Sequence, residues 1–434
     1  MINVVKRKIM SIAEILHLRI FGHEMSDEMR KFLGNLSWSF FGGGIASVAM
    51  LAINIIAGRY IGPEGYGKYV LVLTLSQIFL IPIMFGLDIV SVRSIARSKD
   101  EKEKTKNISS TLYFVLTTLI SFSLLFVFTY KLFAYKFSIS TALLEVCFIF
   151  TIFSAIKLVS DCFIRGLYLF KHQFIGRIIE VCAIIVAFFI FFIIIKQQDY
   201  MSYIWTLIIG AAFLIIFYFK SLIPFFSEFD FNLLKKQLSY GKIIFIGTIL
   251  GTGFNSLDKF IITKELNIYQ LGIYGAYFMA STNLIAQATQ MFINIFFPVA
   301  SKFENRSFLK KLDKIFFIAF IPLFLIISGM IFIIMKLFGE KYGVNLNYVL
   351  SFGILATLQI ILTINASTIT AISKKLFKKY IAYSTAINAV HIVAYGVIIY
   401  LKIVSIQLIV ILLIANVLVT IFIQKKIMKL ALNS

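Results

Sequence analysis

Residues 108–130 read ISSTLYFVLTTLISFSLLFVFTY and contain no acidic or basic side chain. Leu36–Gly58 and Ile403–Ile423 have the same character. Each stretch has roughly the 20 residues that a helix needs to cross ~30 Å of hydrocarbon. Inside a bilayer only helices and closed barrels satisfy their backbone groups, and none of these stretches alternates with a period of two. The sequence therefore predicts an all-α polytopic membrane protein.

Similar apolar stretches fill almost the whole chain. Hydrophobic residues make up 60% of its 434 positions, and the mean hydropathy of +0.93 exceeds that of ordinary soluble domains. We predict twelve transmembrane helices, at 36–58, 69–91, 108–130, 142–164, 174–195, 203–225, 242–263, 272–298, 315–335, 346–371, 379–400 and 403–423.

The formal net charge of +22 has to be interpreted from the positions of the charges. If the N-terminus is cytoplasmic, most of the 42 lysines and arginines fall in connectors and helix ends on the cytoplasmic side. By the positive-inside rule this bias predicts cytoplasmic N- and C-termini. The basicity thus indicates topology and attraction to anionic lipids, and we predict no nucleic-acid partner.

The polar-to-amphipathic connector at 227–241 divides the predicted helices into two sets of six. We predict an amphipathic cytoplasmic segment at 1–34, an N-lobe at 35–226, the connector at 227–241, a C-lobe at 242–426 and a cytoplasmic tail at 427–434. The two halves also show weak internal similarity, which favours parallel repeats. Shifting the sequence by 205 residues places Arg59 on Lys264, Gly67 on Gly272 and Tyr69 on Tyr274.

Motifs of soluble enzymes are missing from the sequence. There is no nucleophile elbow, no Walker GxxxxGK[ST] and no HExxH, so we predict no catalytic residue, no metal site and no bound cofactor. The three cysteines lie in predicted spans without CxxC spacing and are interpreted as small apolar filler. A membrane glycosyltransferase or polymerase is an alternative, but it usually has a large catalytic loop, whereas the longest connector here has about 15 residues.

Polar side chains within the spans are the candidates for a substrate cavity. The span at 272–298 carries an amide stripe at helical spacing, and either a solvated cavity lining or interhelical hydrogen bonding accounts for it. Its members are Asn283, Gln287, Gln290 and Asn294. In the span at 379–400, Ser384, Asn388, His391 and Tyr395 form another polar face, for which we favour interhelical hydrogen bonding.

Ionisable residues inside spans are functional candidates because charge is costly in hydrocarbon. Lys157, Asp161 and Arg165 share one face of the fourth span, with Glu180 expected at a similar depth; they form either an ion-pair ladder or a cationic mouth for a phosphate. Asp88 either pairs with Arg93 or titrates during transport. Asp258 and Lys259 are adjacent and about 100° apart around their helix, so at least one of them should reach another helix or the cavity. Asn54 and Arg59, at the end of the first span, complete the candidates.

Three stretches carry a family resemblance. They are AGRYIGPEGYGKY at 57–69, which we name the outer turn, FGLD at 85–88 with Arg93, and NSLDKFII at 255–262 followed by LGIY at 271–274. With the twelve predicted spans, the chain resembles the Wzx-type polysaccharide flippases of the MOP exporter superfamily over roughly residues 30–426.

The resemblance implies two six-helix lobes around a central cavity, lined by the first two helices of each lobe. It also implies a non-enzymatic flippase that moves undecaprenyl-diphosphate-linked oligosaccharides from the inner to the outer leaflet of the bacterial cytoplasmic membrane by alternating access. Coupling to a proton or sodium gradient, association with a polysaccharide polymerase and a chain-length regulator, and a monomeric state are further expectations. The alternative within the superfamily is a cation-coupled multidrug exporter, but Leu36–Gly58 lacks the acidic residue that such exporters commonly carry in their first helix.

Overall fold

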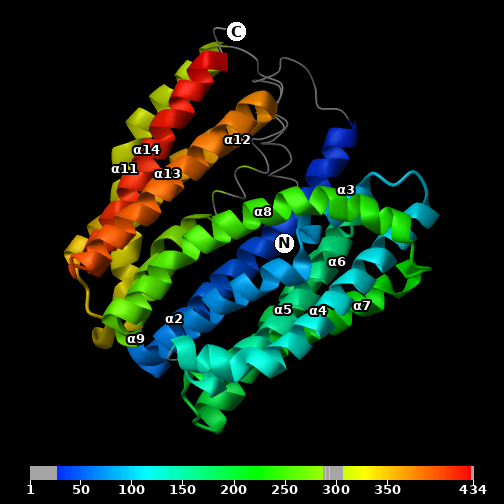
Figure 1. Ribbon diagram of the computed structural model, residues 1–434, viewed down its shortest axis with the longest axis horizontal. Helices are drawn as coiled ribbons and strands as arrows, with labels where there is room; N and C mark the ends of the chain where they lie inside the picture. The colour runs from blue at the N-terminus through cyan, green and yellow to red at the C-terminus, as the bar shows by residue number, and fades with distance from the viewer. Residues whose placement is uncertain are drawn as a thin grey trace. The chain divides into compact units, whose positions relative to one another are not determined.

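The protein is described by a computed structural model that covers residues 27–137, 139–286, 289, 293, 306–372 and 374–431. All regular elements in these ranges are helices (Figure 1). The α-helices are α2 (Asp27–Met84), α3 (Leu87–Ala96), α4 (Glu101–Phe137), α5 (Thr141–Gly166), α6 (Phe170–Phe189), α7 (Tyr200–Leu222), α8 (Phe231–Ile261), α9 (Ile268–Phe278), α11 (Arg306–Phe338), α12 (Leu346–Ile372), α13 (Lys374–Tyr400) and α14 (Ile406–Ala431). The short elements are η1 (Ile190–Ile194), η2 (Ile223–Phe225), η3 (Ile262–Leu266), η4 (Met279–Asn283) and η5 (Glu340–Tyr342).

The predicted helical membrane architecture is confirmed. Within the described ranges, nine helices are long and apolar enough to cross a bilayer. The count of twelve stays a prediction. The spans predicted at 36–58 and 69–91 meet within one of the nine, 242–263 is not among them, and 272–298 runs beyond the described residues.

The outer turn is a sharp kink at Gly62 and not a loop between the two spans predicted at 36–58 and 69–91. Helix α2 runs through it, and Gly62, with φ 70° and ψ 175°, is the position with non-helical backbone angles inside α2. A residue with a side chain is strained at such a positive φ, which explains a glycine there. The chain leaves α2 through two further left-handed residues, Phe85 (φ 47°) and Gly86 (φ 77°).

Two compact units make up the described chain, and each is treated separately. Unit 1 contains the residues up to Asn54 and Leu75–Ile249; unit 2 contains Ile55–Thr74 and the residues from Leu250 onward. The outer turn therefore groups with the second half of the chain, although the sequence assigns it to the N-lobe. The division into two six-helix lobes stays a prediction.

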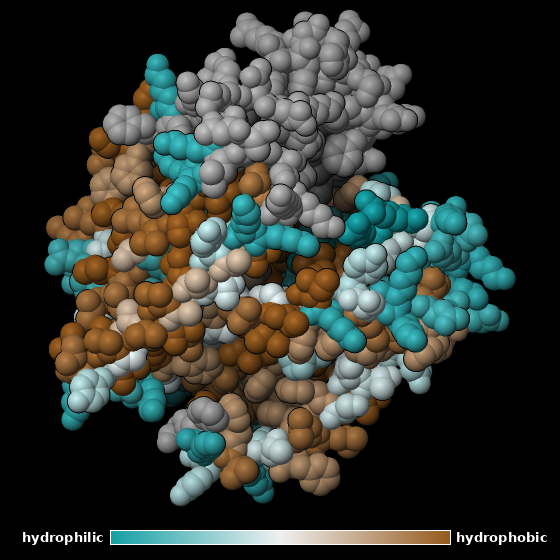
Figure 2. Space-filling model, turned by 45° about the horizontal axis from the view of Figure 1, so that its top comes forward, coloured by the Kyte–Doolittle hydropathy of each residue, from teal (hydrophilic) through white to brown (hydrophobic). Residues whose placement is uncertain are grey.

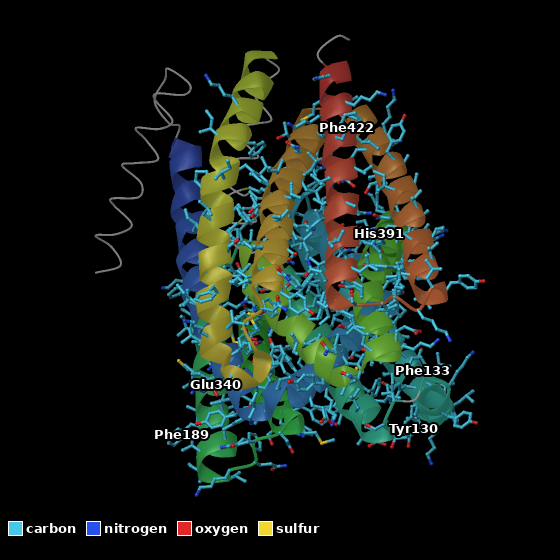
Figure 3. The ribbon with its side chains drawn as sticks, turned by 90° about the vertical axis from the view of Figure 1, so that its left-hand side faces the viewer. Tyr130, Phe133, Phe189, Glu340, His391 and Phe422 are labelled. Atoms are coloured by element: carbon cyan, nitrogen blue, oxygen red, sulfur yellow. The ribbon has the colours of Figure 1, made fainter. Side chains whose placement is uncertain are left out.

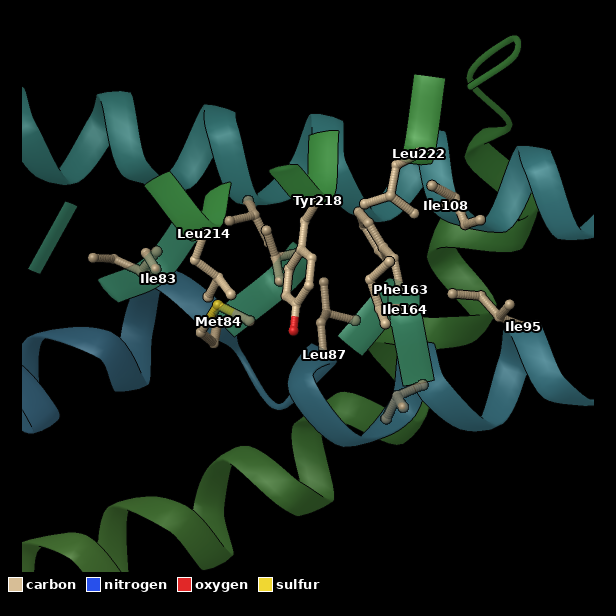
Figure 4. Close-up of a cluster of buried hydrophobic side chains, with 14 residues drawn as sticks. Ile83, Met84, Leu87, Ile95, Ile108, Phe163, Ile164, Leu214, Tyr218 and Leu222 are labelled. Atoms are coloured by element: carbon tan, nitrogen blue, oxygen red, sulfur yellow. The ribbon is translucent and has the colours of Figure 1, made fainter. Parts of the chain in front are cut away.

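Unit 1 is built around a cluster of apolar side chains from the end of α2 and from α3, α4, α5 and α7 (Figure 4). Leu87, Phe163, Leu214 and Tyr218 are all at most 1% exposed. Helices approach closely where a glycine faces a large side chain; a Cβ on Gly176 of α6, for example, would overlap the ring of Tyr218. These contacts hold α6 against α7 and fix the depth of the polar side chains on α5 and α6.

The connector at 227–241 is bound to α4 by buried polar contacts. The Gln237 amide nitrogen donates to Asn107 Oδ1 at 2.8 Å, and Thr111 Oγ1 donates to Gln237 Oε1 at 2.7 Å. The backbone N–H of Asp230 donates to Ser110 Oγ at 2.9 Å. Hydrophilic side chains gather over this end of unit 1, where α3 ends and α4 and α8 begin (Figure 2). The first half of α8 is therefore fixed to unit 1.

In unit 2 the outer turn meets α9 through a reciprocal glycine contact. A Cβ on Gly67 would overlap the carbonyl oxygen of Ile268 and lie 3.0 Å from the backbone nitrogen of Gly272. A Cβ on Gly272 would overlap the carbonyl oxygen of Pro63 and lie 3.0 Å from the nitrogen of Gly67. Gly67 and Gly272 are separated by 205 residues, and so are Pro63 and Ile268. The same shift of 205 residues relates the two halves of the sequence. The contact thus supports an internal repeat whose equivalent segments pack against each other.

Replacing either glycine of this contact by alanine should destabilise the protein strongly, because the new methyl group meets backbone that cannot rotate away. We expect Gly67→Ala and Gly272→Ala each to cost about 3 kcal/mol or more, at the upper end of overpacking effects. Thermal unfolding of purified protein in detergent measures this. Gly396→Ala on α13 is the matched control, since no atom lies within 4 Å of its added Cβ. Equal unfolding temperatures for all three variants would contradict the reciprocal contact.

Acid should loosen the start of α8, because the Asp230 carboxylate caps it. Its Oδ1 accepts the backbone N–H of Leu233 at 3.1 Å and of Asn232 at 3.0 Å, and Lys106 lies 3.6 Å from Oδ2. The bond from Leu233, followed by the charge of Lys106, lowers the pKa of Asp230. The stabilisation is therefore present above the unfolded pKa of about 3.9 and is lost as pH falls through the lower folded value.

Hydrogen exchange at residues 231–234 tests this cap. At neutral pH, Asp230→Ala should exchange faster than wild type, whereas Asp230→Asn, which keeps a capping oxygen, should change little. Equal protection in the alanine variant and the wild type would exclude a role for the carboxylate.

Candidate functional site

The most concentrated polar group in unit 2 lies where α8 ends and α9 begins. Helix α8 carries Asp258 and Lys259 one turn before the π-helical turn η3, and α9 ends in a second π-turn, η4. Asn267 starts α9 by accepting the backbone N–H of Gln270 on its Oδ1 at 2.8 Å. Single π-turns of this kind are frequent at functional sites, because they redirect side chains without breaking the helix.

Asp258 is the centre of this group. The residue is 3% exposed, and the Tyr274 hydroxyl donates to its Oδ2. The Tyr274 ring is itself fully buried and packs against Phe352 of α12, with 5.6 Å between the ring centroids. One carboxylate oxygen is thus fixed by a phenol whose own position is set by packing.

Lys259 neutralises this carboxylate from the same helix. Its Nζ lies 3.1 Å from Asp258 Oδ1, donates to the Asn255 carbonyl at 2.8 Å, and stands 4.6 Å from the Phe278 ring centroid. We expected the two adjacent side chains to diverge by about 100°, and Asp258 does reach α9. Lys259 nevertheless meets it, because a four-carbon side chain can fold back along the helix. The charge is spread over a carboxylate, a carbonyl and an aromatic face.

Unit 1 contains a second polar group, an ion-pair network between α5 and α6. Lys157 pairs with Glu180; Arg165 Nε lies 3.2 Å from Asp161 Oδ2. Arg177 bridges the two acids, at 3.1 Å from Glu180 and 3.3 Å from Asp161. The predicted alignment of Lys157, Asp161 and Arg165, with Glu180 at the same depth, is therefore present in the structure.

The network neutralises both of its carboxylates and retains one positive charge in excess. Three cations face two carboxylates, and both carboxylates are about nine-tenths buried, with side-chain exposures of 11% for Asp161 and 8% for Glu180. An uncompensated carboxylate at this depth would be costly, so the ion-pair ladder describes the resting arrangement. The surplus positive charge leaves a role in anion binding open.

The remaining predicted site residues lie apart from these two groups. No ion pair joins Asp88 to Arg93 among the described residues; Asp88 lies in the first turn of α3, where a helix N-terminus favours a carboxylate, and Arg93 is exposed. In α2, Asn54 is half-buried, and the exposed Arg59 lies beside Gly339, within 3.7 Å of the position that a Cβ would occupy there. Asn283 is exposed in η4. Gln287, Gln290 and Asn294 lie outside the described residues.

Sequence reasoning missed two members of the groups. Arg177 is not among the site residues predicted from the sequence, although its spacing of three residues from Glu180 on α6 is a usable signal. Tyr274 appeared only as part of a motif, because nothing in a linear sequence indicates that its hydroxyl reaches a carboxylate sixteen residues earlier.

The chain matches the model of a family described as polysaccharide biosynthesis protein over residues 32–304. This range includes the outer turn, the unit 1 network and the Asp258 group. No curated protein matches the sequence.

Solved structures with the same fold are transporters of the MOP superfamily. An inward-facing multidrug resistance MATE family transporter is 14% identical, with 88% of this chain and 95% of that chain covered and a TM-score of 0.69. An outward-facing form gives 13% identity, 90% and 93% coverage and a TM-score of 0.64. A MOP superfamily transporter from Pyrococcus furiosus, reported with a binding pocket of reversed polarity, is 12% identical. The match covers 92% of this chain and 96% of that chain, with a TM-score of 0.58.

At these identities the structures establish the fold, and the family match covers more than half of the chain. The chain therefore belongs to the polysaccharide biosynthesis protein family and is a multi-pass membrane protein with the fold of MOP superfamily transporters.

Proposed function

We propose that this protein moves undecaprenyl-diphosphate-linked oligosaccharide repeat units from the cytoplasmic to the outer leaflet of the bacterial cytoplasmic membrane by alternating access. Both termini lie in the cytoplasm, as the distribution of basic residues predicts. The protein acts as a monomer, and a polymerase and a chain-length regulator use the exported units.

The observation that carries the proposal is the Lys259 ammonium group. Its side chain is 14% exposed, in a helix that the sequence places in hydrocarbon, and it is held by one carboxylate, one carbonyl and one ring. A diphosphate can take the place of the Asp258 carboxylate on this cation, because both are anionic oxygen ligands. The neighbouring aromatic face of Phe278 suits the apolar face of a sugar ring.

The buried Asp258 supports a second candidate, export of a cationic small molecule, because a carboxylate at 3% exposure would attract a cation. Lys259 already fills that role, which favours the anionic substrate. Cells without the protein distinguish the two: the flippase predicts loss of surface glycan, and the exporter predicts sensitivity to cationic drugs.

Reconstituted liposomes test the flippase directly. Wild-type protein should expose a lipid-linked oligosaccharide to a lectin on the opposite leaflet, and Lys259→Met should slow this at least about tenfold, because the diphosphate loses its cation. Lys336→Met is the matched control, since Lys336 also stands 4.6 Å from a ring centroid, that of Phe332, but does not contact the Asp258 group. Translocation that is unaffected by adding the protein would contradict the proposal.

A further inference from the structure

Two buried polar atoms beside the Asp258 group have no hydrogen-bond partner in the described part of the chain. They are Nε2 of His391 and the hydroxyl of Tyr395, on residues that are 5% and 3% exposed. A buried polar atom without a partner usually costs about 1–3 kcal/mol, so it needs an explanation. Figure 3 shows His391 on α13.

These two side chains face α8 at the level of Asp258. His391 and Tyr395 are one turn apart, with ring centroids 4.4 Å apart in an edge-to-face arrangement. The Phe254 ring, one turn before Asp258, lies 5.1 Å from the His391 ring. The Asp258 carboxylate is close enough to act electrostatically on both His391 and Tyr395.

The charges that face His391 are few. From α8 the charge is that of Asp258, which is paired with Lys259, and the titratable phenols are Tyr274 of α9 and Tyr395 on its own helix. Helices α12 and α14 pack against α13, and neither α12 nor α14 as far as Gln424 contains an Asp, Glu, Lys, Arg or His. In the described residues, a proton on His391 thus has one carboxylate to interact with.

We propose that Asp258, His391 and Tyr395 form a proton-binding site, and that protonation of His391 draws the Asp258 carboxylate away from Lys259. Nε2 takes a proton from hydronium in the solvent, which leaves water, and the Asp258 carboxylate stays ionised, shared between an imidazolium and an ammonium. The net charge of Asp258, Lys259 and His391 together changes from 0 to +1. The Lys259 ammonium group then shares its carboxylate partner and can bind another anion. This inference rests on the proposed function and adds a way in which pH regulates anion binding at Lys259.

The titration of His391 tests the proton site without any substrate. The chain has four histidines, so NMR of protein labelled with [¹³C]histidine resolves them, and His391→Gln assigns the signal. Asp258→Asn should move the titration midpoint of His391 to lower pH by about one unit, because the stabilising anion is lost. Lys259→Met should move it to higher pH, because the carboxylate is then available to His391 alone. Lys336→Met should leave it unchanged.

The two variants shift the midpoint in opposite directions, so either one decides the question if the other fails to fold. The His172 signal and a single chromatographic peak report folding. A His391 that does not titrate between about pH 4 and 9, or a midpoint that is equal in wild type and in the folded variants, overturns the proposal.

Binding of geranyl diphosphate, a soluble prenyl diphosphate, tests the consequence for Lys259. Wild type should bind it about tenfold more tightly at pH 6 than at pH 8, and His391→Gln should lose this difference beyond the titration of the probe itself. The same pH effect in both proteins overturns the switch. A normal coupled titration without any probe binding or glycan transport would instead contradict the proposed function alone.

Discussion

The Asp258–Lys259 pair is the constraint on which the rest of unit 2 depends, because neither charge can stand alone in a helix that the sequence predicts to lie in hydrocarbon. Insertion scales assign roughly 2.5–3.5 kcal/mol to a single charged side chain at the centre of a membrane helix. Here the carboxylate also accepts a hydrogen bond from Tyr274, and the ammonium has a carbonyl and a ring. Each partner comes from α8 or α9, so the pair fixes how these two helices meet.

The reciprocal contact of Gly67 and Gly272 gives the same region its geometry. Each glycine allows the backbone of the other segment to approach, and Tyr274 follows Gly272 by two residues, as Tyr69 follows Gly67. Packing without Cβ atoms thus places α9 so that its phenol reaches Asp258. The weak repeat in the sequence has a physical basis here, because equivalent segments of the two halves pack against each other. The π-turns η3 and η4 flank the charged group.

Much of this architecture could be predicted from the sequence, since runs such as 108–130 allow only a membrane helix and the spacing of Lys157, Asp161 and Arg165 places them on one face. Contacts between helices could not be predicted from the sequence. Periodicity identifies a face but not its neighbour, so His391 and Asn388 seemed equivalent. Asn388 does bond across helices, accepting from Asn416 at 3.3 Å, whereas His391 packs against Phe254, one turn before Asp258. The outer turn was assigned to the N-lobe because sequence order cannot show that its glycines pack on α9.

The most direct measurement is a double-variant cycle on the buried pair. Lys259→Met and Asp258→Asn should each lower the free energy of unfolding in bicelles by about 3–5 kcal/mol, because each leaves one buried charge without its partner. The double variant, which contains neither charge, should be more stable than either single variant. If the two losses simply add, the pair is not the constraint that holds α8 and α9 together.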